Sequence, residues 1–183
     1  MYMKSKVLKI VHYGTVELGD EVRISDPCYG TVVWCSGECE NIEAGIWDCY
    51  IAMTEDCSNP AYLVMCKDGY QFDIPKEIEM ASIGVDSGTC GVYDLDYYEK
   101  YHSERDVDED WYHRNVMSWC MKDRAFICEE GMGFVSKTGY GDGCYYFLTE
   151  RNTKGRVVRM AIDYDICKVD RRRCKFEYEF EEK

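Results

Sequence analysis

"CYYFLTERNTKGRVVRMAI", residues 144–162, predicts a β-hairpin. Two runs rich in aromatic and β-branched residues flank a short polar segment, and residues of these types favour the extended backbone of a strand. The polar segment contains Asn152 and Gly155, which are residue types that tight turns prefer. A pair of antiparallel strands is therefore the starting point for the fold.

Runs of the same kind recur along the chain and are bounded by Gly, Asn, Asp or Pro, which is typical of short strands. They cover residues 6–12, 31–35, 46–53, 61–67 and 125–129. Near the C-terminus, "KFEYEFEE" at residues 175–182 alternates aromatic residues with glutamate, the period-two pattern of a half-buried strand. We therefore expect an α+β fold built predominantly on antiparallel β-sheet.

One amphipathic helix is predicted from about Asp108 to Lys122. Its apolar stripe recurs at helical spacing and consists of Tyr112, Val116, Trp119 and Cys120. A second, shorter helix is predicted for "YDLDYYEKYH", residues 93–102. We expect a single domain over residues 1–183, with one or two helices forming an acidic insertion at about residues 95–122.

The 12 cysteines would suit a disulfide scaffold in a short secreted chain, but the N-terminal stretch "MYMKSKVLKIVHYG" lacks the unbroken apolar segment of a signal peptide. We therefore expect free thiols in a reducing compartment, the cytoplasm of a bacterial host cell. No apolar run approaches the roughly 20 residues that a membrane-spanning helix needs, so no membrane partner is expected.

Cysteine spacing also bears on metal binding. Cys28, Cys35, Cys39 and Cys49 lie within one stretch, but they do not form the paired C-x-x-C knuckles of structural zinc sites. Other cysteines fall inside strand-like runs, where a thiol behaves as a small apolar side chain. We expect no metal and no cofactor, with a zinc site as the alternative.

The net charge of −13 is unevenly distributed. Residues 1–60 and 61–123 carry −6 and −8, whereas residues 124–183 carry +1. Such segregation favours a face that presents anions, with a more basic side behind it. A solvated acidic surface with no binding role is the alternative, and composition by itself does not exclude it.

The densest acidic stretch runs from residue 94 to residue 110 and contains eight carboxylates but only two basic residues, Lys100 and Arg105. Some of these acids suit the first turn of a helix, where carboxylates complement unpaired backbone amides. Crowding the others together destabilises the fold through repulsion, which a binding role would explain. The candidate partner-binding residues are these acids and the two aromatic residues that follow: Asp94, Asp96, Glu99, Glu104, Asp106, Asp108, Glu109, Asp110, Trp111 and Tyr112.

Arginines concentrate in the last third of the chain and are candidates for a secondary contact with nucleic-acid phosphates. They are Arg151, Arg156, Arg159, Arg171, Arg172 and Arg173. Pairing with acids of the same chain is the alternative.

Two motifs raise the possibility of hydrolytic chemistry. "DSG" at residues 86–88 has the local look of an aspartic-protease loop, but that mechanism needs two carboxylates that share a proton. A single copy would require a symmetric dimer. Cys28, which follows Asp-Pro, would need a nearby base to act as a nucleophile. A turn is the simpler interpretation of both, and we expect no catalytic residue.

The glycine-rich segment at residues 139–143 places three glycines around Asp142. Glycines let backbone amides approach a phosphate, and Tyr140 and Tyr145 could stack on a base, so a nucleotide immune signal is a candidate ligand. Asp142 would repel a phosphate, however, and Asp-Gly between two strands is typical of a hairpin turn.

Four stretches together carry a resemblance. "VRISDPCYGTVVWC" at residues 22–35 resembles the opening of small proteins of unknown function from phages and mobile elements of Firmicutes. "VDSGTCGVYD" at 85–94, "GYGDGCYYF" at 139–147 and "AIDYDI" at 161–166 are similar to a bacterial domain family of unknown function. The blocks look structural, so the resemblance assigns no catalytic residues.

The chain is also similar in size and composition to type II anti-CRISPR proteins, which inhibit RNA-guided Cas nucleases. The resemblance implies a non-enzymatic inhibitor with a type II Cas nuclease and its guide RNA as partner. Such nucleases hold nucleic acid in basic channels and recognise the PAM with arginines, so clustered carboxylates can compete for those groups. The expected function is therefore inhibition of DNA binding or cleavage through an acidic surface.

Overall fold

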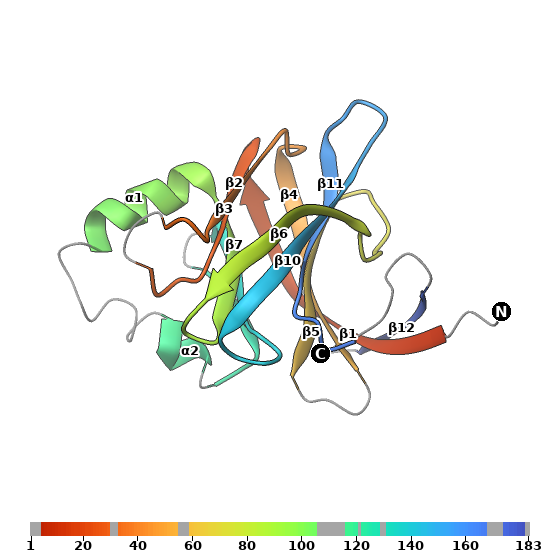
Figure 1. Ribbon diagram of the computed structural model, residues 1–183. Helices are drawn as coiled ribbons and strands as arrows, with labels where there is room; N and C mark the ends of the chain where they lie inside the picture. Colours follow the sequence, from red (N-terminus) through yellow and green to blue (C-terminus); the bar gives the residue numbers. More distant parts are fainter. Residues whose placement is uncertain are drawn as a thin grey trace.

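The computed structural model describes residues 5–29, 33–54, 59–105, 116–120, 122–128, 131–167 and 174–181. Its strands form two sheets (Figure 1). The larger sheet contains β1 (Ser5–Leu18), β4 (Gly45–Thr54), β5 (Pro60–Lys67), β6 (Glu77–Val85), β10 (Gly143–Arg151), β11 (Val157–Asp163) and β12 (Lys175–Glu181). The smaller sheet contains β2 (Glu21–Ser25), β3 (Gly37–Glu40), β7 (Thr89–Asp94), β8 (Ala125–Ile127) and β9 (Gly133–Lys137).

The strand order is β12-β1-β4-β5-β11-β10-β6 in the larger sheet and β3-β2-β7-β9-β8 in the smaller one. Among the described strands, all pairings are antiparallel except that of β1 with β12. The structure is mostly strand with little helix, which agrees with the predicted β-rich α+β class.

The main core lies between the two sheets. It joins residues of the larger sheet, such as Trp47 and Phe147, to residues of the smaller sheet, such as Ile24 and Phe134, and all four are fully buried. Burial of such large apolar side chains contributes roughly 1.5–3 kcal/mol each. This shared core fixes the ends of β2, β6 and β10 relative to one another.

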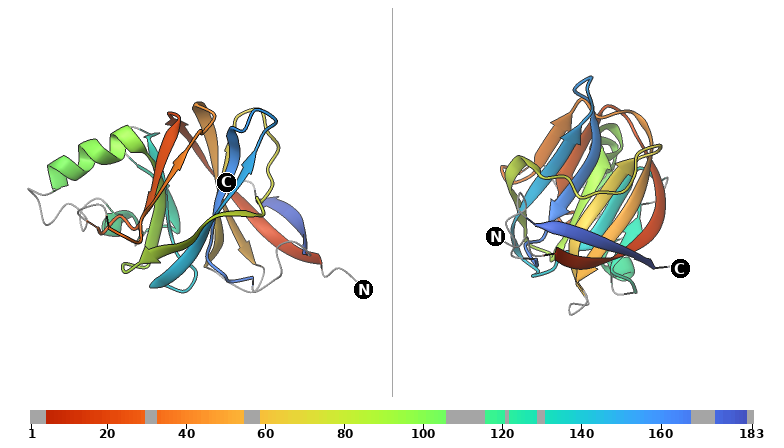
Figure 2. Two further views of the ribbon diagram at one scale, coloured as in Figure 1. Left: turned by 45° about the horizontal axis from the view of Figure 1, so that its top comes forward. Right: turned by 90° about the vertical axis from the view of Figure 1, so that its right-hand side faces the viewer.

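The outer faces of both sheets are also covered in part. On the larger sheet, Phe72 and Ile74 pack with strand residues such as Tyr62. On the smaller sheet, helix α1 (Leu95–Arg105) places Tyr97 and Tyr98 against Tyr93 of β7. In the left-hand view of Figure 2, α1 lies at one end of the molecule and the paired β1 and β12 at the other.

The predicted hairpin at residues 144–162 is confirmed by the antiparallel pairing of β10 with β11. In its turn, the backbone N–H of Gly155 donates to the carbonyl of Asn152 at 2.9 Å. The Asn152 side chain accepts hydrogen bonds from the backbone N–H groups of Lys154 and Arg156. The expected strands at 6–12, 46–53, 61–67, 125–129 and 175–182 correspond to β1, β4, β5, β8 and β12.

The strand predicted at residues 31–35 is wrong over its described part. Residues 33–36 form a turn in which the Val33 carbonyl accepts hydrogen bonds from the backbone N–H of Ser36 at 3.0 Å and from its hydroxyl at 2.9 Å. The serine side chain thus offers the backbone an alternative to strand pairing. As a result, Trp34 is 90% exposed.

The shorter predicted helix is confirmed as α1, which begins at Leu95. Of the longer helix predicted from Asp108 to Lys122, the described residues include a helical segment at 116–120, whose last part is α2 (Ser118–Cys120). Val116 is buried as the stripe predicts, but Trp119 is 49% exposed. Trp119 instead stacks on Phe126 of β8, with ring centres 6.2 Å apart.

Candidate functional site

Five carboxylates come together where β2 begins, beside β3 and the first turn of α1. Glu21 of β2 stands directly opposite Glu40 of β3 in the antiparallel register. The charges of Asp20, Glu38 and Asp96 also act on Glu21. We call these five residues the acidic cluster.

The acidic cluster is electrostatically unfavourable for the folded chain. Partial desolvation, followed by the charges of the other four members, raises the pKa of the Glu21 carboxyl above its ordinary value. Buried Arg23 forms an ion pair with Glu38, and its guanidinium lies 5.6 Å from the centre of the Tyr98 ring. Within the described residues this ion pair offsets the charge of Glu38, whereas Glu21 and Glu40 lie directly opposite each other.

Asp94 was predicted to contact a partner, but it is only 5% exposed and caps α1. One carboxylate oxygen accepts a hydrogen bond from the backbone N–H of Tyr97 at 3.1 Å, three residues into the helix. The other accepts from the backbone N–H of Gly19 at 2.8 Å. Asp94 therefore joins α1 to the β1–β2 turn and does not belong to the exposed acidic surface.

Asp96 and Glu99 are exposed on α1, as a binding role requires. Glu104 lies in the last turn of the same helix. The other predicted partner-binding residues lie outside the described part of the chain: Asp106, Asp108, Glu109, Asp110, Trp111 and Tyr112.

Three of the predicted nucleic-acid-binding arginines bond within the protein. Arg151 donates to Glu79 at 2.9 Å, and Arg156 donates to the carbonyl of Ile42 at 3.3 Å. Arg159 donates to Glu150 at 2.5 Å and lies over the Tyr70 ring. These contacts favour pairing within the chain. Arg171, Arg172 and Arg173 lie outside the described residues.

The "DSG" segment forms the turn between β6 and β7, and Asp26 holds it in place. Asp26 is fully buried, and its carboxylate accepts four hydrogen bonds. The backbone N–H groups of Asp86 and Ser87 donate to Oδ2 at 2.8 and 2.7 Å. The Cys28 backbone N–H and the Ser87 hydroxyl donate to Oδ1 at 2.7 and 2.6 Å. A carboxylate satisfied in this way is a structural brace between two loops.

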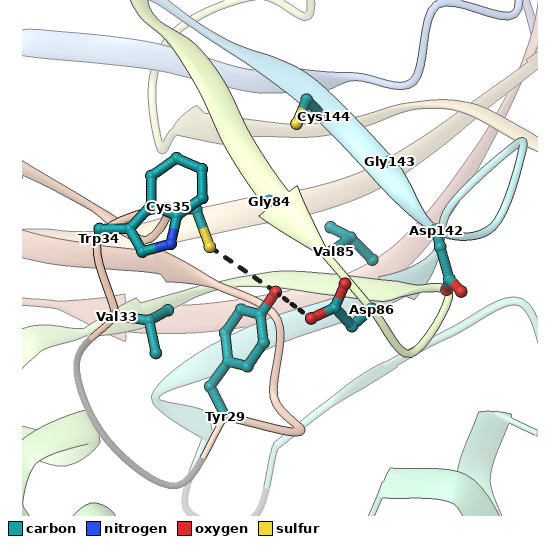
Figure 3. Close-up of a pocket in the computed structure, with 10 residues that line it drawn as sticks. All are labelled: Tyr29, Val33, Trp34, Cys35, Gly84, Val85, Asp86, Asp142, Gly143 and Cys144. Atoms are coloured by element: carbon teal, nitrogen blue, oxygen red, sulfur yellow. Dashed lines mark hydrogen bonds between the residues drawn. The ribbon is translucent and has the colours of Figure 1, made fainter.

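This brace positions one wall of a pocket of about 360 Å³ (Figure 3). The Tyr29 hydroxyl donates to Asp86 Oδ2 at 3.1 Å, and the Cys35 thiol donates to the Tyr29 oxygen at 3.7 Å. Burial first, and then the hydrogen bonds to Cys35 and Asp86, raise the pKa of Tyr29, so its hydroxyl keeps its proton and donates. Gly84 leaves room for Cys35, since a Cβ atom there would lie 2.6 Å from the Cys35 sulfur.

The glycine-rich loop at residues 139–143 contributes Asp142 and Gly143 to the lining of this pocket, next to the β6–β7 turn, because Gly143 pairs with Val85. Two hydroxyl groups fix the loop, because Thr138 and Tyr145 both donate to the Gly141 carbonyl, at 2.6 and 2.7 Å. Gly141 has a φ of 88°, in the region that glycine adopts at no steric cost. Tyr145 is buried, so it is not placed to stack on a ligand, whereas Tyr140 is exposed.

Cys28 is poorly suited to nucleophilic attack. Burial and the neighbouring Asp26 charge raise the pKa of its thiol to about 12, so the thiolate is scarce near neutral pH. Burial likewise raises the pKa of Cys39 and of Cys66 to about 11. Within the described residues, no three His, Cys, Asp or Glu side chains gather as a metal site would require.

No family model, curated protein or solved structure matches this chain. No helix in the described part of the chain has both the length and the apolar character needed to cross a membrane.

Most of the acidic cluster was missed in the sequence, because pairing of strands brings together residues that are far apart along the chain. Only Asp96 was among the candidates. The available signal was the alternation of Glu38 and Glu40 in a short polar run before a turn, which marks the outward face of a strand. The pocket residue Trp34 was missed for the opposite reason, since an apolar run was expected to be buried.

Proposed function

We propose that this chain is a non-enzymatic inhibitor that binds a basic nucleic-acid-binding protein through its acidic cluster and the adjoining exposed face of α1. The resemblance to type II anti-CRISPR proteins identifies the partner in this proposal as a type II Cas nuclease with its guide RNA. The inhibited step is DNA binding or cleavage.

The observation that carries the proposal is the pairing of Glu21 with Glu40 among three further carboxylates. Like charges in directly opposite positions destabilise a sheet. Folding therefore does not account for this arrangement, whereas a basic partner would turn the repulsion into attraction on binding. Complementary charge also accelerates association and makes it sensitive to salt.

The same surface is continuous along the chain with the densest acidic stretch. Helix α1 begins within the acidic cluster at Asp96 and carries exposed Glu99. Residues 106–110 follow α1 in the sequence and add four further acids. The two groups of acids supply the many negative charges that competition with DNA phosphates requires.

The test is a DNA-cleavage titration with a purified type II nuclease and guide, in which this protein is added before or after the target DNA. We expect inhibition that weakens when DNA is loaded first, because both ligands would compete for basic groups. A binding assay at about 50 and 200 mM salt should show the steep salt dependence of an electrostatic interface.

Two triple charge reversals make the test specific. The first removes the acidic cluster: Glu21→Lys, Glu40→Lys and Asp96→Lys. The matched control changes the net charge equally at exposed acids elsewhere: Asp68→Lys, Glu77→Lys and Glu179→Lys. We expect the first variant to lose inhibition and the control to retain it, with thermal melting confirming that both are folded. Equal inhibition by both variants would refute a role for the cluster.

A further inference from the structure

The charged residues that line the pocket beside the Asp26 brace are all acidic. Of the ten residues that line it, Asp86 and Asp142 are acidic and none is basic (Figure 3). Both carboxylates come from exposed turns, Asp86 from the β6–β7 turn and Asp142 from the turn before β10. A pocket with this lining attracts cations and repels phosphates.

Two aromatic side chains complete the lining. Trp34 is 90% exposed although it lines the pocket, so most of its indole surface is available to a ligand. In Figure 3, Tyr29 lies between Trp34 and the Asp86 carboxylate. The faces of Trp and Tyr rings attract ammonium and guanidinium groups, and the attraction strengthens where water is excluded.

The polar groups of the pocket are held before any ligand arrives. Asp26 fixes the backbone of residues 86 and 87 through two hydrogen bonds, and Tyr29 donates to Asp86. One Asp86 oxygen thus has a protein partner, and the carboxylate keeps further acceptor capacity for a ligand. Prepositioned groups of this kind reduce the ordering that binding requires.

We propose that this pocket binds an organic cation, a guanidinium or primary ammonium group on an alkyl chain, between the carboxylates of Asp86 and Asp142 and the rings of Tyr29 and Trp34. The volume of about 360 Å³ lies within the range of small-ligand sites. The inference rests on the pocket alone and is independent of the acidic cluster, which lies at the other end of the β2–β3 pair.

The lining of the pocket also argues against the nucleotide ligand that the glycine-rich loop suggests. Asp142 belongs to that loop and faces the pocket together with Asp86. A phosphate placed there would meet two negative charges, and no basic residue of the lining would offset them. A cationic ligand is therefore the chemistry that this loop favours.

Calorimetric titration with four probes tests the proposal. N-acetyl-arginine N-methylamide presents a guanidinium group as a protein side chain would, and agmatine presents it on a free small molecule that also carries a primary ammonium group. N-acetyl-citrulline N-methylamide has nearly the same shape but no charge, and AMP supplies a phosphate. We expect at least one cationic probe to bind with a dissociation constant of about 1 mM or lower, and both controls to bind at least roughly tenfold more weakly.

Matched variants locate the site. Asp86→Asn with Asp142→Asn removes both charges and should weaken cation binding roughly tenfold or more. Asp20→Asn with Asp96→Asn removes two charges from the acidic cluster and should leave the affinity within about twofold, since exposed distant charges are screened. Trp34→Leu should weaken cation binding several-fold and leave the protein folded, because the Trp34 side chain is exposed.

Five results would overturn the proposal. The first four are no saturable binding of either cation, equal affinity for the arginine and citrulline probes, AMP binding as tight as cation binding, and unchanged affinity in the folded Asp86→Asn, Asp142→Asn variant. An equal loss in the Asp20→Asn, Asp96→Asn variant would overturn it too, because the effect would then follow net charge. Nuclease inhibition is also measured for the Asp86→Asn, Asp142→Asn variant, so a failure of cation binding can be distinguished from a failure of the proposed inhibitory function.

Discussion

Replacing Asp26 by asparagine tests how much the brace contributes to stability. The change keeps size and shape but removes the negative charge and converts one acceptor oxygen into an NH₂ donor. In the native protein Oδ1 accepts from Cys28 and Ser87, and Oδ2 accepts from the backbone N–H groups of Asp86 and Ser87. An asparagine has one oxygen, so it can satisfy only one of these two pairs of donors.

The magnitude follows from the hydrogen bonds that are lost. If the amide oxygen takes the Oδ1 position, its NH₂ group faces the N–H groups of Asp86 and Ser87 and both lose their acceptor. A hydrogen bond to a charged group contributes roughly 1.5–3 kcal/mol, so two losses lower the free energy of unfolding by roughly 3–6 kcal/mol. For a chain of this size the thermal midpoint should fall by roughly 6–24 °C.

The assay is urea unfolding followed by circular dichroism, with the thermal midpoint as a second measurement. Asp68→Asn is the matched control, because Asp68 is exposed and its loss should change stability by less than about 1 kcal/mol. If Asp26→Asn unfolds at the same urea concentration as Asp68→Asn, the four contacts do not stabilise the loops as argued.

Three further outcomes are expected. Gly84→Ala should lower stability by about 1–3 kcal/mol, because the new Cβ would lie 2.6 Å from the Cys35 sulfur; urea unfolding at the wild-type midpoint would contradict this. Burial raises the pKa of the Cys66 thiol from 9.0 to about 11, so the neutral form is favoured in the folded state and stability should fall as pH rises from about 9 to 11. Thermal melts over that range should show a smaller fall in Cys66→Ala. Added NaCl should raise the thermal midpoint, because salt screens the repulsion within the acidic cluster. Glu40→Gln should raise the midpoint for the same reason, whereas Glu77→Gln should not. Equal midpoints of the two variants would argue against repulsion at the cluster.

The sequence predicted several of the elements in which local preference and burial agree, although it missed the buried strands β7 and β9. The β10–β11 hairpin combines aromatic strands with an Asn-to-Gly turn, and α1 carries Tyr97 and Tyr98, which pack against Tyr93. β6 was not predicted, because its first half carries exposed Glu77 and Glu79 and it lies at the sheet edge. An edge strand with a solvent-exposed half lacks the apolar pattern on which sequence prediction depends.

The candidate sites were less predictable, since both depend on contacts between distant residues. The sequence placed the anionic surface on one continuous acidic stretch, whereas Glu21 and Glu40 meet only through strand pairing. Asp94 looked like another surface acid, and only its two backbone donors reveal a cap. Asp26 looked like an ordinary residue of an Asp-Pro turn, because its donors in the β6–β7 turn lie 60 and 61 residues away.

The parallel pairing of β1 with β12 has a consequence for how the chain reaches its native state. Ser5 lies opposite Lys175, a separation of 170 residues, so this edge can pair only after nearly the whole chain has been made. During synthesis the β1 edge therefore stays unpaired while the ribosome makes every other strand of the sheet. We expect docking of β12 to be a late step of folding, before which the open edge is prone to aggregate.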